Sequence, residues 1–196
     1  MMPSMTPMSY SRILPPPPPR PRALQTTALG CVAAAIADAV GDLCNWTAEG
    51  KLEAQHLLIK DLGLATKTTD LAEAAKSARL RFGSRCSFKV VPIDLAEAVQ
   101  YACQGAGVVV GLASLIPDRP GHAYHLLRGT FPMEDPDLHL SRVEAAQQKA
   151  MDDLQEEVTL WDPSDGTIAT EAYGSVRRRF ERIREVLVIQ QLRETR

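Results

Sequence analysis

A cysteine at a helix start and a glutamine six residues upstream are the first residues of this chain that could do chemistry. Residues 23–40 read ALQTTALGCVAAAIADAV, with Gln25 in a loop of small residues and Cys31 opening an alanine-rich apolar run. A thiol at the first turn of a helix lies in the positive end of the helix dipole, which lowers its pKa and favours the nucleophilic thiolate. The backbone N–H groups there and the Gln25 amide could hold an oxyanion. The pair therefore indicates nucleophilic attack on a carbonyl.

Such a thiol needs a histidine to share its proton and a polar group to orient the imidazole. The segment GHAYHLLRG offers His122 and His125, which strand alternation places on opposite faces, so only one can point at Cys31. The segment WDPSDG places Asp162 at the end of another predicted strand, with Asp165 further into the turn. If these two strands are neighbours, the Asp162 carboxylate can reach the far nitrogen of the ring.

Each of these residues has a plain structural interpretation when taken alone. Cysteine is among the residue types most often buried, and Asp-Pro is a common turn former. The conjunction in this order, with every residue at an element boundary, is what indicates a catalytic site. The remaining candidates are interpreted as core cysteines or surface histidines (Cys44, Cys86, Cys103, His56 and His139), and the cluster at 177–179 as a solvated helix face.

Composition excludes several classes of function. The chain has 196 residues, 45% hydrophobic and 23% charged, and a net charge of −2, which gives no reason to expect nucleic acid as a partner. No apolar run approaches the ~18 residues of a membrane span. The four cysteines show no CxxC pairing, which favours reduced thiols in the cytoplasm and no zinc site. No glycine-rich phosphate loop follows a strand, so we expect no metal and no cofactor.

The chain divides into a tail and one folded domain. Residues 1–22 contain five consecutive prolines, Pro15 to Pro19, which favour polyproline II and a disordered leader. A ligand for a proline-binding module is the second interpretation of that leader. The folded domain is expected over residues 23–196.

The order of predicted elements is helices first and sheet later, which is typical of an α+β fold. Apolar spacing and caps predict helices over 31–43, 49–62 and 70–82, the last with Thr69 or Asp70 as N-cap. A strand at 87–93, a helix over 95–104 capped by Asp94 and a buried strand at 107–113 follow. Strands are then expected at 122–131, 158–161 and 185–192, with a charged helical insertion at about 134–157 and a basic amphipathic helix at about 170–183.

The ordered set of Gln, helix-opening Cys, Gly-His strand and Asp-Pro turn resembles papain-like cysteine peptidases. The nearest resemblance is to the bacteriocin-processing peptidases, which cut leader peptides after a double glycine, and it covers about residues 23–192 in outline. The Gly-His-Ala-Tyr segment is also similar to that around the catalytic histidine of calpains. The resemblance implies an N-terminal helical part packed on a C-terminal antiparallel sheet. It also implies Gln25 in the oxyanion hole, Cys31 as nucleophile, His122 as general base and Asp162 as its orienting residue.

The function that this resemblance implies is a thiol peptidase acting on a peptide or isopeptide bond of a peptide or protein substrate. Two alternatives remain at this stage. The same machinery could serve an effector or toxin that catalyses deamidation, transglutamination or removal of ubiquitin-like tags. The domain could also be catalytically idle and bind peptides.

Overall fold

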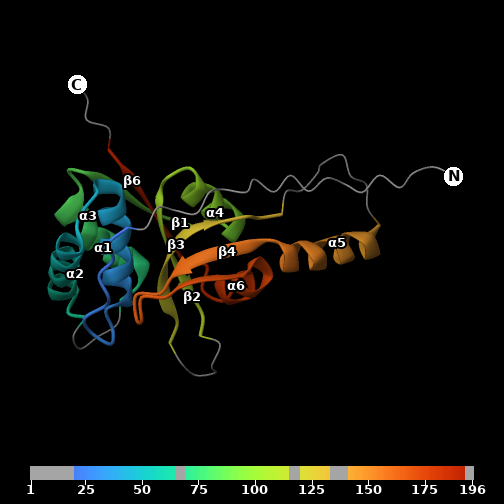
Figure 1. The fold of residues 1–196 in the computed structure, drawn as a ribbon, viewed down its shortest axis with the longest axis horizontal. Helices are drawn as coiled ribbons and strands as arrows, with labels where there is room; N and C mark the ends of the chain where they lie inside the picture. Colours follow the sequence, from blue (N-terminus) through green and yellow to red (C-terminus); the bar gives the residue numbers. More distant parts are fainter. Residues whose placement is uncertain (1–19, 65–68, 115–119, 133–140, 193–196) are drawn as a thin grey trace.

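The computed structural model describes residues 20–64, 69–114, 120–132 and 141–192. The proline run at 15–19 and part of the segment at 134–157 lie outside these residues. The described elements comprise helices α1 to α6 and one antiparallel sheet in the order β1-β6-β2-β3-β4-β5. The fold is therefore α+β, with the N-terminal helices packed on the sheet as expected (Figure 1).

The N-terminal helical part consists of α1 (Cys31–Cys44), α2 (Ala48–Leu62) and α3 (Leu71–Phe82). Helix α1 is buried continuously from Val32 to Gly41, because it lies between α2 and the sheet strands β2 and β3. An alanine-rich helix suits this place, since small side chains let neighbouring elements approach on every side. Gly63 ends α2 with a φ of 64°, which glycine adopts without strain.

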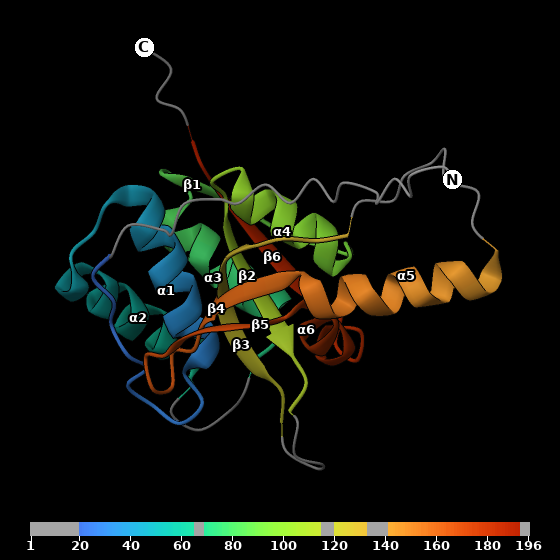
Figure 2. The same cartoon turned by 45° about the vertical axis from the view of Figure 1, so that its right-hand side comes forward.

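The sheet is built from β1 (Cys86–Val91), β2 (Gly107–Leu112), β3 (His122–Gly129), β4 (Glu157–Trp161), β5 (Ile168–Ala172) and β6 (Val186–Gln191). Strand β2 is buried along its whole length, as its unbroken run of apolar residues predicts. Helices α1 to α3 pack on one face of the sheet, while α4 (Leu95–Cys103) and α6 (Tyr173–Phe180) pack on the other (Figure 2).

Strands β3 and β4 are hydrogen-bonded neighbours. This pairing is what the sequence-based prediction required for the Asp162 carboxylate to reach the His122 ring. In this pairing, the His125 backbone lies opposite Trp161, and Trp161 directly precedes Asp162 in the sequence. Neighbouring antiparallel strands carry side chains at matching positions into contact. The first residues of β3 and the turn after β4 therefore share one end of the sheet.

The predicted helix over 170–183 is wrong in its first part. Residues Ile168–Ala172 form the edge strand β5, which pairs with β4 through a tight turn, and the helix covers only Tyr173–Phe180. Strand β5 is largely exposed and carries no apolar alternation, so the sequence pattern gave no strand signal. A contact between the hydroxyls of Thr159 and Thr170, 3.0 Å apart, joins the two strands.

Helix α5 (Arg142–Gln155) lies within the charged segment and extends away from the sheet (Figure 1). It begins at Ser141 with a capping box that Glu144 completes, and no residue of this helix is buried. Every helix described is too short or too polar to cross a membrane.

Candidate active site

Cys31 is the first residue of α1, and its sulfur is partly exposed at the helix N-terminus. The N-cap is Gly30, which has no side chain to offer, and no side chain caps this helix end. The first backbone N–H groups of α1 are thus left without the side-chain acceptor that most helices provide. This local sequence favours a negative charge on the sulfur or on an atom bound beside it.

His122 is the first residue of β3 and lies between Cys31 and Asp162. Its Nε2 is 2.8 Å from Oδ1 of Asp162, and the two side chains are 25% and 22% exposed. The Cys31 thiol is the second partner of the imidazole, because each of these two groups shifts the pKa of the other. Because Nε2 faces the carboxylate, Nδ1 is the ring nitrogen left for the sulfur. The structure therefore brings together three residues that lie far apart in the sequence.

The ionisation of Cys31 and His122 reflects this contact. Burial raises the pKa of the Cys31 thiol. The hydrogen bond and charge of His122, together with the backbone N–H groups of Ala123 and Val32, lower this pKa by more, so the net shift is downward. Burial lowers the pKa of His122, but the Cys31 contact and the Asp162 charge more than offset this, and the net shift is upward. Opposite shifts of this kind favour a thiolate–imidazolium pair.

Asp162 is held by the turn that joins β4 to β5. Its Oδ1 accepts hydrogen bonds from the backbone N–H of Ser164 at 2.8 Å and from the Ser164 hydroxyl at 2.6 Å. The turn closes through Gly166, whose N–H donates to the Asp162 carbonyl at 2.9 Å and whose φ is 77°. Three donors on one oxygen, the two Ser164 groups and Nε2 of His122, fix the orientation of the carboxylate. Sequence reasoning missed Ser164, although a serine two residues after Asp is a common turn pattern.

Asp165, the alternative to Asp162, has a different partner. Its Oδ1 accepts from the backbone N–H and hydroxyl of Thr167, at 2.8 and 2.7 Å. The bonds to Thr167 stabilise the same turn, while the hydrogen bond to the imidazole is made by Asp162.

Gln25 lies in the loop that precedes α1. Its side-chain Nε2 donates to the Thr27 carbonyl at 3.1 Å, and the same carbonyl accepts from the Gly30 N–H at 3.0 Å, so the amide lies beside the helix start. Nε2 carries a second N–H beyond the one given to Thr27. The Gln25 backbone N–H donates to the Pro163 carbonyl at 2.8 Å, which ties this loop to the turn that carries Asp162.

His125 is not beside Cys31. Its ring is 4% exposed, and its Nδ1 donates to Oδ2 of Asp38 at 2.7 Å. Burial first, and then the nearby cations, lower the pKa of His125 to about 3, so the imidazole is neutral. The sequence left the choice between the two histidines to their context, and the geometry places His122 at the thiol.

A buried charge cluster surrounds His125, and sequence reasoning missed it. Asp38 also accepts from Lys51 at 2.7 Å and from Arg22, while Asp42 accepts from both cations. The sequence feature that could have indicated this cluster is Asp38 itself, an aspartate inside the alanine-rich run of α1. An unpaired charge there would be costly, so partners had to be expected. Arg22, assigned by sequence to the leader, therefore contacts α1 directly.

Asp38, Asp42 and His125 have ligand atoms within 4.8 Å of one another, a spacing that suits a metal ion. The two carboxylates already bind the Lys51 ammonium and the Arg22 guanidinium, however. A divalent cation would have to share this space with two positive charges, so the donor set does not fit a metal.

The other thiols lie elsewhere in the fold. Cys44 and Cys86 have sulfurs 3.9 Å apart, and Cys103 donates to the Gly129 carbonyl at 3.4 Å. All four cysteines are free.

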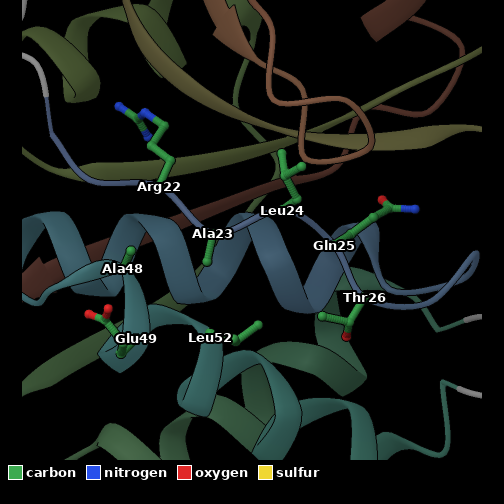
Figure 3. Close-up of a pocket in the computed structure, with 8 residues that line it drawn as sticks. All are labelled: Arg22, Ala23, Leu24, Gln25, Thr26, Ala48, Glu49 and Leu52. Atoms are coloured by element: carbon green, nitrogen blue, oxygen red, sulfur yellow. The ribbon is translucent and has the colours of Figure 1, made fainter.

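A cavity of about 380 Å³ adjoins the loop that carries Gln25 (Figure 3). It lies between the segment 22–26 and the first turns of α2, where Ala48, Glu49 and Leu52 complete its lining. Gln25 therefore lines this cavity and also belongs to the loop that precedes α1.

Comparisons with known proteins support the fold. No family model matches the sequence, and no curated protein matches it. Among solved structures, the chain is similar to the peptidase domain of Streptococcus ComA, a bi-functional ABC transporter involved in quorum sensing. The TM-score is 0.54 and the sequence identity 10%, over 88% of this chain and 97% of that domain. The chain therefore has the papain-like α+β fold of that peptidase domain.

Proposed function

We propose that this chain is a cysteine peptidase that hydrolyses a peptide or isopeptide bond. The observation that supports this most directly is the contact series from the Cys31 thiol through His122 to Asp162, at the uncapped start of α1. The papain-like fold adds independent support, because the similar solved structure is a peptidase domain.

In the proposed mechanism, the Cys31 thiolate attacks the scissile carbonyl carbon and forms a C–S bond. The negative charge moves to the carbonyl oxygen, where the Cys31 backbone N–H and the free N–H of the Gln25 amide stabilise it. Imidazolium His122 gives its proton to the leaving amine as the C–N bond breaks. Neutral His122 then takes a proton from water, whose oxygen attacks the thioester and releases the acid and the thiolate. Asp162 keeps the ring oriented throughout.

The finer parts of the proposal concern domain organisation and substrate. We assign residues 1–22 to a leader whose last part bonds to α1 through Arg20 and Arg22, residues 23–196 to the catalytic domain and residues 134–157 to an insertion. We place the protein in the cytoplasm. The Gly-His segment and the chain order of the site support a relationship to the bacteriocin-processing peptidases. A proline-binding partner for the leader is a separate proposal, carried only by the proline run.

Labelling with a thiol-reactive peptide probe tests the catalytic proposal. The full chain should react at Cys31, and the labelling should vanish in Cys31→Ala and fall sharply in His122→Ala. Cys103→Ala, which removes a thiol that bonds a backbone carbonyl, is the matched control and should label normally. Equal labelling of the wild type and of His122→Ala would overturn the proposed base.

The reaction type needs a second measurement. Incubation with a mixture of peptides should release new N-termini, detected by mass spectrometry, without release of ammonia. Ammonia without new N-termini would instead identify a deamidase, and a labelled but otherwise unreactive chain would identify a peptide-binding domain.

A further inference from the structure

Tyr124 lies against the imidazole of His122. The two residues are separated by one position on β3 and so project from the same side of the strand. Their ring centroids are 4.8 Å apart and the ring planes meet at 79°, an edge arrangement that aromatic pairs favour. One flank of the His122 ring is therefore closed by a second ring.

Tyr124 is itself fixed from behind by Arg179 of α6. Nη2 of Arg179 donates to the Tyr124 hydroxyl at 3.0 Å, and the guanidinium lies 5.4 Å from the ring centroid. Nη1 of Arg179 donates to both carboxylate oxygens of Glu171 on β5 at 3.1 Å, and Nε to the Ala113 carbonyl at 3.3 Å. Arg179 is 8% exposed, so its guanidinium is a rigid support rather than a mobile surface charge.

Each ring nitrogen of His122 has its own fixed partner, so both contacts exist in only one ring orientation. A support that keeps this orientation is therefore needed. Rotation of the ring about its bond to Cβ would move Nε2 off Asp162 and Nδ1 off Cys31 together. The side chain stands at the first residue of a strand and is one-quarter exposed, so its own backbone position restricts it little. A hydrogen bond from Nε2 to Asp162 connects the ring to the β4–β5 turn.

From this geometry we infer that Tyr124 is a positioning residue: its ring, fixed by Arg179, holds the His122 imidazole in the orientation that serves Cys31 and Asp162 at once. The inference rests on the proposed function. The titratable and charged groups that act on His122 are Cys31 from α1, Asp162 and Asp165 from the β4–β5 turn, and Tyr124 on its own strand.

The test follows the rate at which iodoacetamide alkylates Cys31 in the full chain between pH 4 and 9, read from the Cys31 peptide by mass spectrometry. The wild type should keep a reactive thiolate well below the pH at which an ordinary thiol ionises. Tyr124→Leu should move the rate profile about one pH unit towards alkaline pH, which is a loss of about tenfold in rate at any pH well below the thiol pKa of both proteins. Tyr124→Phe, which keeps the ring, should restore most of the rate.

Tyr101→Leu is the matched control, since Tyr101 belongs to α4, packs against the core on the other face of the sheet from Cys31 and should leave the profile unchanged. If Tyr124→Leu fails to fold, Tyr124→Phe combined with Arg179→Met keeps the ring and removes its anchor, and a fall of about threefold in rate is expected from a loosened hydrogen-bond network. An unchanged profile in the folded variant overturns the positioning role alone. A wild type without a low-pH thiolate overturns the proposed function and the positioning role together.

Discussion

Nδ1 of His125 lies 2.7 Å from Oδ2 of Asp38, which joins the middle of the helix that begins at Cys31 to the strand that begins at His122. Asp38 also binds Arg22, three residues before Gln25, and Lys51 of α2. One buried carboxylate thus connects three of the four segments that carry the candidate site, the fourth being the β4–β5 turn.

Replacement of Asp38 should destabilise the whole fold. Asp38→Asn keeps the size of the side chain but leaves Lys51 and Arg22 with Asp42 as their remaining counter-charge, and breaking a buried pair in this way costs about 3–5 kcal/mol. Urea denaturation followed by circular dichroism measures the loss. Asp61→Asn, which breaks a surface pair with Arg81, is the control and should leave the midpoint nearly unchanged. Equal midpoints for the two variants would contradict the role of the cluster.

Acid should weaken the protein through His125. Burial lowers the folded-state pKa of His125 to about 3, below its ordinary value near 6.5, so the unfolded chain binds a proton that the folded chain does not. The stability that His125 contributes is therefore complete above about pH 6.5 and is lost as the pH falls from there towards 3, by at most about 1.4 kcal/mol per pH unit. Urea midpoints at several pH values should show a shallower acid slope in His125→Gln. A parallel slope would mean that His125 is protonated in the native protein.

Loss of the Asp162 charge should reduce thiolate formation at Cys31. The Asp162 carboxylate raises the pKa of His122, and protonated His122 lowers that of Cys31, so Asp162→Ala should raise the thiol pKa. At pH values well below the thiol pKa, alkylation of Cys31 should fall about tenfold if that pKa rises by one unit. Ser164→Ala should give a smaller fall. Asp165→Ala, which loses its bonds to Thr167 and a charge that acts on His122, should also give a smaller fall than Asp162→Ala. A fall in the Asp165 variant equal to that in the Asp162 variant would favour a general effect of the turn.

Gln25 should matter for turnover and not for alkylation. Its amide would bind the oxyanion, which forms during attack on a carbonyl but not during alkylation by iodoacetamide. Gln25→Ala should lower kcat for any cleaved peptide by about 10²-fold, the usual cost of one oxyanion donor, with an unchanged alkylation rate. Parallel losses in both measurements would indicate that Gln25 acts on the loop structure instead.

Fast alkylation at neutral pH should modify one thiol per chain. Burial, and then Cys44, raise the pKa of Cys86 to about 12, and Cys103 is bonded to a backbone carbonyl. Intact-mass spectra should show a rapid single addition that Cys31→Ala abolishes. A rapid second addition would show that another thiol is activated.

The sequence predicted the elements whose signals are local. Asp70 and Asp94 cap α3 and α4 as their positions indicate, and the unbroken apolar run of β2 is buried on both faces. Strand β5 could not be predicted in this way, because an exposed edge strand has no alternating pattern and is defined by its partner β4.

The candidate site could be predicted from the sequence because its residues lie where a helix or strand begins or ends, and such boundaries have local signals. Cys31, His122 and Asp162 all lie at such boundaries, and the pairing of β3 with β4 brings the last two together. Asp38 was visible as a charge in an apolar helix, but its partners come from three distant segments, and no local pattern specifies them.

The hydrogen bond from the Gln25 backbone N–H to the Pro163 carbonyl joins the loop of the oxyanion-binding amide to the turn that carries Asp162. The two bonded residues are 138 positions apart in the sequence. A displacement of the β4–β5 hairpin tip would move the Asp162 carboxylate and, through this hydrogen bond, also the loop that carries the Gln25 amide. Ligands or mutations that reach only this surface hairpin therefore have a route to switch proton transfer and charge stabilisation off in a single movement.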